Sequence, residues 1–583
     1  MSCGKYEMLL TKLTQIIGLR RRPSAEDLIA KGTAFLNAGA WQDATACFEA
    51  ALQAAPHDFA LLNNLGLCRA NSGNLDEAAE CFKQVLRLAP DSAPALMNLG
   101  NIELSRANPE DAIVHYEAAL ARVSADPGLV NNLGMAYRAT AQVDAAIRCF
   151  RRALSIEPRF CDAHDNLLYC MQLLPEYGPE EVYAEHRRWA DIHEAPLQAR
   201  VPLYANDRDP RRRLRIGYVS PDFRRHAVAK FIEPVIAHHD HQRFQVNCYH
   251  NTNASDAVTV RIRQHADIWR EVAHLSDDSL AALIRADGID ILVDLAGHTR
   301  GGRLLCFARK PAPLQLTYLG HGNTTGLRAM DFRITDAVAD PPGFADRFHS
   351  ERLLRLPRAQ WCFRPDDDAL PAGPLPALTS GHITFGSFNN LWKINDAVIA
   401  AWSRVLLRVA GSKLLIIGIP GRSTRERFEA AFAGHGVDPS RLRLLAPVSD
   451  ADFWSLRHEI DIALDPFPYN GVTSTCEALY AGTPMTTLAG TYGQSCTAAS
   501  LLTAAGLGDL VARTEEEYVE INVRLASDLH NLSGLRASLR GRMQDSPLMD
   551  YRSLTLALEG LYRGIWTDWT AGHPLPQLPG AKP

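Results

Sequence analysis

The sequence lacks the features that would place the chain in a membrane, a secreted or a zinc-dependent class. No apolar run reaches the roughly 18 residues that a membrane-spanning helix needs, and polar residues interrupt the apolar stretch at 8–19 that could serve as a secretory signal. The twelve cysteines form no CxxC pair, which argues against a zinc site or a disulfide framework. Acidic residues outnumber basic ones by 66 to 61, which disfavours generic nucleic-acid binding. We therefore expect a cytoplasmic protein with no metal, membrane or nucleic-acid partner.

Lysine is also scarce. Only nine of the 61 basic residues are lysines, and codon bias is the simplest explanation. A lysine that is kept where chemistry prefers lysine is nevertheless informative. The composition is otherwise that of a globular chain, with 46% hydrophobic and 22% charged residues. The length of 583 residues corresponds to about four domains of ~150 residues each.

The N-terminal third repeats with a step of 34 residues. A glycine, an alanine, an aromatic residue and a leucine all recur at this step, and the glycines are Gly32, Gly66, Gly100 and Gly134. Small residues let two antiparallel helices approach, the larger ones fill the space between them, and a proline such as Pro56 follows the second helix. This is the pattern of the tetratricopeptide repeat. Four copies cover residues 25–159, and a further helix at 162–174 caps an α-superhelix whose concave face is of the kind that binds peptides.

The same register carries a row of asparagines on successive first helices, namely Asn64, Asn98, Asn132 and Asn166. An asparagine side chain offers both a donor and an acceptor to an extended peptide backbone. The same side chains can instead form hydrogen bonds between repeats. The row therefore predicts either a peptide-binding ladder or an inter-repeat network.

From residue 213 onward, short apolar runs alternate with amphipathic segments, which is typical of parallel α/β sheets. A Pro/Gly-rich linker at 365–381 separates two such parts. Two doubly wound domains place a ligand between them, at the carboxyl ends of the strands, so the chemistry should lie in loops that follow strands. We expect strands at 214–220, 244–249, 289–295, 314–319 and 332–335, then at 383–387, 413–418, 443–445, 460–464 and 485–488, with helices such as 255–266, 276–287 and a last one at 552–566.

Polar loops follow two strands of the first part. His226 and Asp222 lie after the first strand, where a neutral imidazole can act as a general base. His298 and Thr299 follow another strand, and for them ligand contact and plain turn chemistry are equally open. The glycines at 320–326 have three residues instead of two between the second and third, which argues against a nicotinamide fingerprint.

Two loops of the second part suit a phosphate. Lys393 lies just before an expected helix, and an ammonium group beside helix N–H groups can hold a diphosphate. Further along, Gly471 permits a tight turn, and Glu477 can accept hydrogen bonds from ribose hydroxyls or simply serve the helix dipole. Hydroxyls gather at the start of this helix, on Thr473, Ser474 and Thr475. Two phosphate-suited loops in one part favour a nucleotide-sugar ligand.

Together these motifs resemble the protein O-GlcNAc transferase family, including its SPINDLY-like branch, over nearly the whole chain. The resemblance rests on the order and spacing of SPDFRRHAV (220–228), ILVDLAGHT (291–299), PAPLQLTYLG (311–320), MDFRITDAVADPP (330–342), TFGSFNNLWKI (384–394), DPFPYNGVTSTCEALYAGTP (465–484) and SLLTAAGL (500–507). It implies a tetratricopeptide-repeat α-superhelix followed by a GT-B catalytic region of two Rossmann-like domains. The chain departs from common family patterns at His321-Gly322, at Ser474 and at 493–496.

The resemblance also implies an activity, which is inverting transfer of GlcNAc from UDP-GlcNAc to Ser/Thr hydroxyls of proteins, with no metal and no cofactor. The repeats would present the acceptor along the asparagine row. His226 and Lys393 are the implied catalytic residues, and Asp222, His298 and Thr299 the acceptor or sugar side. The implied donor site consists of Asn390, Lys393, Thr473, Ser474, Thr475, Glu477 and Gly320.

Two alternatives stay open, a protein O-fucosyltransferase that uses GDP-fucose and a repeat scaffold that only binds nucleotide. A homodimer is compatible with the exposed repeat surfaces. We expect an N-terminal extension at 1–22, repeats at 23–175, a helical connection at 176–212, a first catalytic half at 213–364, the linker at 365–381, a second, nucleotide-sugar-binding half at 382–566 and a tail at 567–583.

Overall fold

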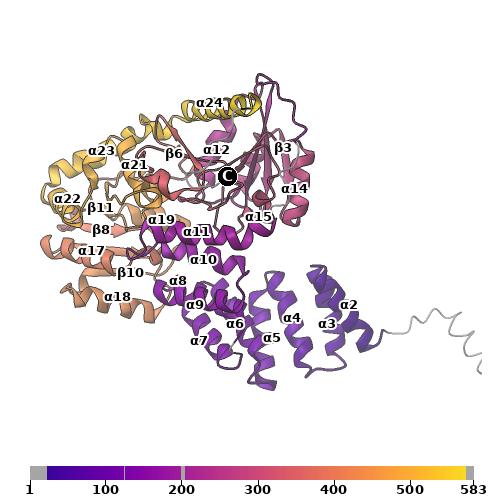
Figure 1. Ribbon diagram of the computed structural model, residues 1–583. Helices are drawn as coiled ribbons and strands as arrows, with labels where there is room; N and C mark the ends of the chain where they lie inside the picture. The colour runs from indigo at the N-terminus through magenta and orange to yellow at the C-terminus, as the bar shows by residue number, and fades with distance from the viewer. Residues whose placement is uncertain (1–22, 124, 198–203, 573–583) are drawn as a thin grey trace, which may run out of the picture. The chain divides into compact units, whose positions relative to one another are not determined.

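The computed structural model describes residues 23–123, 125–197 and 204–572, so the predicted N-terminal extension and most of the predicted tail lie outside it. The chain forms two compact units that divide between Leu133 and Gly134. The first holds repeat helices only. The second holds the last repeat helices together with both α/β halves (Figure 1). The end of the repeat array thus packs into the same unit as the sheets, and the domain boundary near residue 175 stays a prediction.

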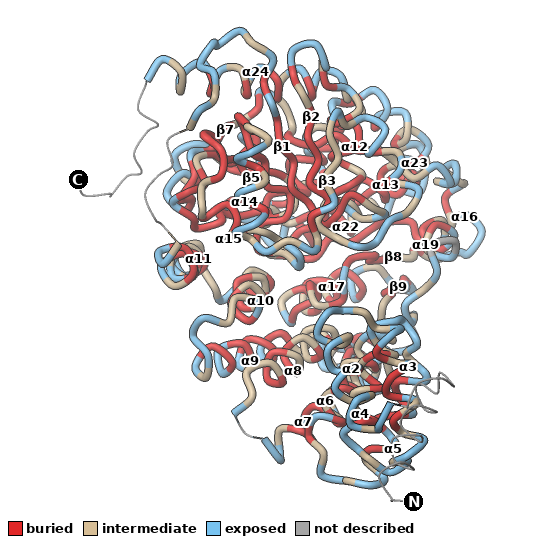
Figure 2. The backbone as a smooth tube through the Cα atoms, turned by 90° about the vertical axis from the view of Figure 1, so that its right-hand side faces the viewer, coloured by how far each residue is buried: buried red, intermediate tan, exposed pale blue. Residues whose placement is uncertain are grey.

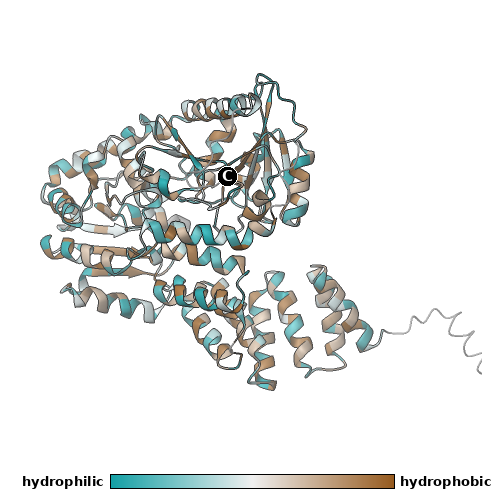
Figure 3. Cartoon of the chain, viewed as in Figure 1, coloured by the Kyte–Doolittle hydropathy of each residue, from teal (hydrophilic) through white to brown (hydrophobic). Residues whose placement is uncertain are grey.

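The predicted repeats are present as antiparallel helix pairs. Their glycines lie against the aromatic residue of the same repeat, and a Cβ added to Gly66 would approach the Phe82 ring to 2.7 Å. The helices carry both hydrophilic and hydrophobic residues along their length (Figure 3), as expected for elements that bury one face. They are α2 (Ala25–Asn37), α3 (Trp41–Leu52), α4 (Phe59–Asn71), α5 (Leu75–Leu88), α6 (Ala93–Ser105), α7 (Pro109–Leu120), α8 (Pro127–Ala139), α9 (Val143–Ile156) and α10 (Cys161–Met171).

The asparagine row makes hydrogen bonds between repeats at two of its positions. The Asn98 amide donates to Asn63 Oδ1 at 3.2 Å, and the Asn132 amide donates to Asn101 Oδ1 at 2.9 Å. In the second unit, Asn166 Oδ1 accepts from Arg138 at 3.0 Å. The inter-repeat alternative therefore accounts for part of the row, and peptide binding stays a prediction.

Each α/β half contains one parallel sheet covered by helices. The first sheet has seven strands in the order β3-β2-β1-β4-β5-β6-β7, and the second has six in the order β10-β9-β8-β11-β12-β13. The central strands are mostly buried, and most exposed residues lie on the surrounding helices, loops and edge strands (Figure 2). Strand bounds are β1 (Leu214–Ser220), β2 (Phe244–His250), β3 (Ile268–Glu271), β4 (Ile291–Asp294), β5 (Leu314–Thr317), β6 (Phe332–Asp336), β7 (Arg352–Leu356), β8 (Thr384–Ser387), β9 (Lys413–Ile417), β10 (Leu442–Leu445), β11 (Ile462–Leu464), β12 (Met485–Leu488) and β13 (Val511–Ala512).

All ten predicted strands are present, but the structure adds β3, β7 and β13, and each of these lies at the edge of its sheet.

Two helices lie outside the α/β halves, α11 (Pro179–His193) in the predicted connection and the short α16 (Ala377–Ser380) in the predicted linker. The helices of the α/β halves are α12 (Ala229–His238), α13 (Ala257–Gln264), α14 (Asp277–Ala286), α15 (Leu304–Ala308), α17 (Asp396–Arg408), α18 (Arg422–Gly434), α19 (Asp450–Arg457), α20 (Thr473–Tyr480), α21 (Thr497–Ala504), α22 (Glu515–Ser527), α23 (Leu529–Gln544) and α24 (Tyr551–Thr570).

The last helix, α24, corrects the predicted end of the second half. Its apolar stripe, from Leu554 to Trp566, packs in the core of the first half beside Ile232 and Tyr218. Tyr562 and Tyr218 exchange a hydrogen bond between their hydroxyls at 3.2 Å. Figure 1 shows α24 (yellow) lying beside α12. The chain therefore returns to the first half after completing the second.

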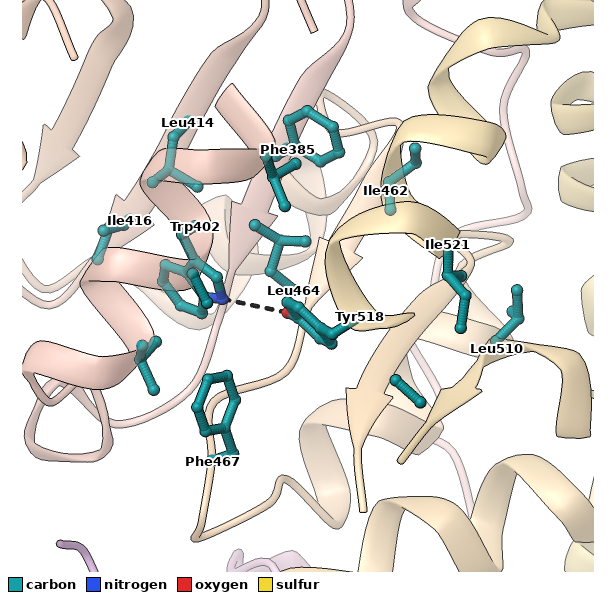
Figure 4. Packing of buried hydrophobic residues seen from close by; sticks show 14 of the residues in the cluster. Phe385, Trp402, Leu414, Ile416, Ile462, Leu464, Phe467, Leu510, Tyr518 and Ile521 are labelled. Atoms are coloured by element: carbon teal, nitrogen blue, oxygen red, sulfur yellow. Dashed lines mark hydrogen bonds between the residues drawn. The ribbon is translucent and has the colours of Figure 1, made fainter. Parts of the chain in front are cut away.

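The core of the second half reaches directly to a site loop. Figure 4 shows Trp402 and Tyr518 packed among apolar side chains of the strands. Trp402 Nε1 donates to the Tyr518 hydroxyl at 3.1 Å, and that hydroxyl donates to the backbone oxygen of Asp465 at 3.2 Å. Because Asp465 follows β11, the buried core fixes the start of the loop that the sequence analysis marks for phosphate binding.

The close approach within each repeat can be tested with Gly66→Ala. The added methyl group would meet the Phe82 ring at 2.7 Å, so we expect the free energy of unfolding to fall by about 1–3 kcal/mol, measured by urea denaturation. Gly434→Ala in α18 is the matched control, because nothing lies within 4 Å of its added carbon. Equal stability of the two variants would contradict the packing.

Candidate functional site

The polar loops follow the strands at which the strand order of each parallel sheet reverses. In the first sheet, β1 pairs with both β2 and β4, and in the second sheet β8 pairs with both β9 and β11. Consecutive crossovers leave toward opposite sides at these points, which opens a crevice at the carboxyl ends of the strands. The loops after β1, β4, β8 and β11 are the ones that carry the predicted site residues. The predicted clustering at strand ends is therefore compatible with the sheet order.

Lys393 lies in this region and its amine is buried, with 8% of the residue exposed. Nζ donates to Asn389 Oδ1 at 3.2 Å and to the backbone oxygen of Asn470 at 3.0 Å. Burial lowers the pKa of Lys393 to about 8, while Asp465 acts in the opposite direction. An ammonium group has three N–H bonds, so two of these are accounted for by the protein and a third is available to a ligand.

Asp465 and Asn389 fix the loop after β11. This loop contains the Asn470 carbonyl that accepts from Lys393. Asp465 Oδ1 accepts from the Gly471 N–H at 2.8 Å, and Oδ2 accepts from the Thr487 hydroxyl at 2.7 Å. A Cβ on Gly471 would lie 2.9 Å from Asn389 Oδ1 and 3.0 Å from Asp465 Oδ1. Gly471 is thus required for space, and not for the unusual backbone conformation that a tight turn would need.

The three hydroxyls at the start of α20 have different surroundings. Ser474 Oγ donates to Asn389 Oδ1 at 3.0 Å, and Thr475 Oγ1 donates to the Gly471 carbonyl at 2.9 Å. Thr475 is buried, whereas Thr473 and Ser474 are half-buried. Thr473 and Ser474, with the first N–H groups of the helix, are therefore the part of this segment that an anion can reach. Asn390 is exposed, and its neighbour Asn389 makes the contact with Lys393.

Glu477 joins the two halves through its carboxylate. Oε1 accepts from Lys230 Nζ of α12 at 2.7 Å, and Oε2 accepts from Arg457 of α19 at 2.6 Å. Lys230 also pairs with Asp366 of the linker at 2.5 Å. The Arg457 guanidinium is buried and lies 4.7 Å from the ring centre of Phe388. The residue predicted to bind ribose thus also bridges the two halves.

His226 and Asp222 come together in the loop after β1, with His226 Nδ1 3.4 Å from Asp222 Oδ1. Burial and the nearby Arg224 lower the pKa of His226 to about 4, and burial raises the pKa of Asp222 to about 6. The imidazole is therefore neutral at pH 7. It borders a cavity of about 140 Å³, whose lining also includes Lys230 and Asp366.

His298 and Thr299 are engaged inside the protein. His298 Nδ1 lies 2.7 Å from Asp165 Oδ1 of α10, and Nε2 lies 2.8 Å from the Thr325 carbonyl oxygen. The Thr299 hydroxyl donates to the Ala296 carbonyl at 2.8 Å. Of the two interpretations left open by the sequence, these bonds favour structural roles for both residues over direct ligand contact.

Two of the positions at which the chain departs from the family patterns, Gly322 and Gln494, are in contact. A Cβ on Gly322 would meet the amide of Gln494, so the missing side chain makes room for Gln494. Gln494 Nε2 donates to the Asn470 carbonyl at 3.4 Å, the same oxygen that accepts from Lys393. Gly320 instead packs against the backbone of Leu295, where any side chain would collide. Glycine is therefore needed at position 320 because a side chain would not fit there.

Sequence reasoning missed several residues of this site, namely Lys230, Asn389, Arg457, Asp465 and Gln494. Asp465 and Asn389 lie at or near the first position after a strand. The expectation that functional residues follow strands could therefore have identified both. Lys230 is one of the nine lysines and lies four residues after His226, at the start of α12. Its contact with Glu477 depends on the docking of two halves, for which no sequence signal exists.

Within the described ranges, no group of three or more His, Cys, Asp or Glu side chains is arranged to hold a metal ion. No helix in the same residues combines the length and apolar character that crossing a membrane requires.

The family comparisons agree with the fold. Residues 190–366 and 375–558 match the model of glycosyl transferase family 41, while 29–93, 69–129 and 128–160 match tetratricopeptide repeats. The chain is similar to the probable UDP-N-acetylglucosamine–peptide N-acetylglucosaminyltransferase SPINDLY of Solanum lycopersicum, at 41% identity over 72% of this chain and 46% of that protein. The Petunia hybrida protein of the same name is 40% identical over 72% of this chain and 46% of its own length. The chain thus spans about half the length of these relatives.

Among solved structures, a mutant O-GlcNAc transferase of Thermobaculum terrenum is similar at 37% identity with a TM-score of 0.83, covering 88% of this chain and 98% of that one. A repeat array followed by two parallel α/β halves with facing strand-end loops is the architecture of a two-domain glycosyltransferase. The chain belongs to glycosyl transferase family 41. This finding confirms the family and the fold class predicted from the motifs.

The bridge between the halves can be tested with Glu477→Gln. Arg457 would lose the carboxylate that pairs with it in a buried position, so we expect the free energy of unfolding to fall by about 3 kcal/mol. Glu516→Gln removes an exposed carboxylate from Arg404 in the same half and should change the stability by less than about 0.5 kcal/mol. Denaturant unfolding of both variants measures the difference, and equal losses would count against a structural bridge.

Proposed function

We propose that the protein transfers GlcNAc from UDP-GlcNAc to Ser/Thr hydroxyls of proteins with inversion at the sugar. The observation that carries the proposal is the buried Lys393 amine beside the start of α20, in a chain of glycosyl transferase family 41. The names of the plant relatives and of the bacterial structure, which describe peptide or protein GlcNAc transfer, support it. A reducing cytoplasm is the proposed setting, in keeping with the eleven described cysteines, all of which are free thiols.

In the proposed reaction the acceptor oxygen forms a bond to the anomeric carbon while the bond from that carbon to the diphosphate oxygen breaks. The leaving UDP then carries an additional negative charge. Lys393 and the N–H groups at the start of α20 are suited to stabilise this charge without a metal ion. Thr473 and Ser474 add hydroxyl donors at the same place, and transfer should continue in the presence of EDTA.

The acceptor proton needs a base on the opposite face of the sugar. We propose His226, because its neutral ring borders an open cavity at the cleft. In this structure the Val228 N–H donates to His226 Nδ1 at 3.3 Å, so the proposed base is the other tautomer, in which Nδ1–H turns to Asp222 Oδ1 and Nε2 accepts the hydroxyl proton. Asp222 would then orient the ring and stabilise its charged form.

We propose that the repeats present the acceptor, with asparagines contacting its backbone. Asn64, Asn132 and Asn166 are half-buried, so their side chains keep a solvent-facing part, while Asn98 is buried and bonded to Asn63. Asn98 is therefore the member of the row least suited to peptide contact. A homodimer remains part of the proposal, because the repeat surfaces leave room for one.

The second candidate is O-fucosyl transfer from GDP-fucose, which the resemblance to the SPINDLY-like branch implies. The 41% identity to a SPINDLY protein is the observation that favours it. Both candidates use the same diphosphate chemistry at Lys393, so they differ in the nucleobase and the sugar.

Titration of the full chain with UDP and GDP, followed by incubation with labelled UDP-GlcNAc or GDP-fucose and a cell lysate, separates these functions. We expect UDP-selective binding and incorporation of GlcNAc into protein. Selectivity for GDP with fucose incorporation would replace the first candidate by the second. Nucleotide binding without transfer to any acceptor would indicate a scaffold.

The role of Lys393 predicts a pH dependence of nucleotide binding. The amine is protonated below its pKa of about 8 and neutral above it, so the affinity for UDP should fall as the pH rises through that value. Lys393→Met should bind UDP at least about tenfold more weakly and lose this pH dependence, and Lys393→Ala should abolish transfer. Lys413→Met, at the exposed start of β9, is the matched control. Wild-type activity in Lys393→Ala would refute the assigned role.

A further inference from the structure

An aromatic side chain of the last repeat helix packs directly on the loop between β11 and α20, which contains Tyr469. Tyr169 of α10 lies with its ring centre 5.4 Å from that of Tyr469, at an angle of 52°. Trp392, next to Lys393 in sequence, donates from Nε1 to the Tyr169 hydroxyl at 3.0 Å. All three side chains are half-buried and belong to the compact unit that begins at Gly134.

Arg138 of α8 fixes the outer side of this cluster. Its guanidinium lies 5.3 Å from the ring centre of Tyr169 and 5.7 Å from that of Trp392. The same guanidinium donates to Asn166 Oδ1 at 3.0 Å, so it is held from the repeat side as well. Planar guanidinium groups stack favourably on aromatic faces, which keeps Tyr169 and Trp392 in one arrangement.

The inner side of the cluster faces the buried amine. Lys393 Nζ lies 4.7 Å from the ring centre of Tyr469. The face of an aromatic ring is the negative part of its quadrupole, so it attracts an ammonium group, and more strongly where water is excluded. Asn389 and the Asn470 carbonyl fix the same amine from other directions.

We infer that Tyr469 is a positioning residue for Lys393, and that Tyr169 of the last repeat helix positions Tyr469. This inference rests on the proposed function, because it gives the donor diphosphate to Lys393. It also makes α10 part of the donor site, so the two α/β halves alone do not complete that site. Neither tyrosine needs to touch the nucleotide sugar to act in this way.

The charged and titratable groups around Lys393 are few. Asp465, at the end of β11, is the carboxylate that stabilises its charged form. Burial raises the pKa of the Tyr169 and Tyr469 hydroxyls, so both stay neutral at physiological pH. Arg138 lies beyond Tyr169. Removal of the Tyr469 ring would therefore withdraw a group that favours the ammonium form and leave burial, which opposes it, unchanged.

The test uses the full chain and UDP as the probe, with affinity measured by calorimetry across the pH range that spans the Lys393 pKa of about 8. Tyr469→Leu should bind UDP about tenfold more weakly and lose affinity at a lower pH than the wild type. Tyr469→Phe keeps the ring and should stay within about threefold with an unchanged pH midpoint. Tyr169→Leu should weaken binding in the same direction as Tyr469→Leu, and Tyr169→Phe should restore most of it.

Tyr480→Leu is the matched control, because it removes an aromatic ring from Arg540 at 4.2 Å in the same half without touching Lys393. It should bind UDP as the wild type does. Wild-type affinity and pH midpoint in Tyr469→Leu would overturn the inference. So would an equal loss in Tyr469→Phe and Tyr469→Leu, since the ring face would then be irrelevant.

A second measurement needs no destabilising variant. With only nine lysines in the chain, selectively labelled lysine gives a simple NMR spectrum, in which Lys393→Arg identifies the Lys393 signal. The Tyr469 ring should shift the Lys393 side-chain protons upfield in the wild type, and the absence of that shift would overturn the positioning role. Failure of the wild type to bind any nucleotide would instead refute the proposed function, and the ring-current shift would still decide the inference.

Discussion

The arrangement of the second half depends on one constraint, which is the positively charged amine of Lys393 buried beside the start of α20. Lys393 can stay there only because the surrounding chain supplies acceptors in fixed positions. Asp465 supplies the compensating charge, and its own oxygens are held by Gly471 and Thr487. The Tyr518 hydroxyl in turn fixes the Asp465 backbone from the core. The core of the second half is therefore continuous with the group that we assign to the diphosphate.

One of the contacts between the halves lies beside the same helix start. Lys230 of the first half and Arg457 of the second bind different oxygens of one carboxylate, that of Glu477. A carboxylate accepts about four hydrogen bonds, so each Glu477 oxygen retains capacity for a ligand hydroxyl. A residue that the sequence assigns to ribose can thus serve the ligand and the interdomain bridge at once.

The sequence predicted the features that local patterns encode. The strand at 214–220 has the bounds that the apolar run indicated, because a central parallel strand is buried on both faces and, apart from the exposed Arg215, consists of buried and mostly apolar residues. Two of the missed strands lie at sheet edges and carry charge, since β3 ends in Arg270 and Glu271 and β7 contains Arg352 and Arg355. Charged residues are common on edge strands, where they discourage pairing with other chains, and they hide the strand from a hydrophobicity argument.

What the sequence could not supply is the pairing of distant segments. The stripe of the last helix was recognised, but nothing in it indicates that it packs on the first half and not on the second. The same limit applies to the site, where Asn390 was selected although its neighbour Asn389 makes the contact with Lys393. The choice between adjacent residues depends on the exact path of a loop, and that path is set by Asp465 and Gly471, more than 70 residues further along the chain.

The scarcity of lysine is best interpreted by where the described lysines lie. Two of them come from opposite halves, Lys230 bound to Glu477 and Lys393 bound to the Asn470 carbonyl, in a chain that uses arginine almost everywhere else. A guanidinium is planar and offers its donors in one rigid fork, whereas an ammonium is compact and can direct three N–H bonds to acceptors that do not share a plane. Lys393 meets a side-chain amide and a backbone carbonyl from separate segments, above an aromatic face, which is an arrangement that suits a point charge. Codon bias explains why lysine is rare, but the geometry of these acceptors explains why lysine is retained here.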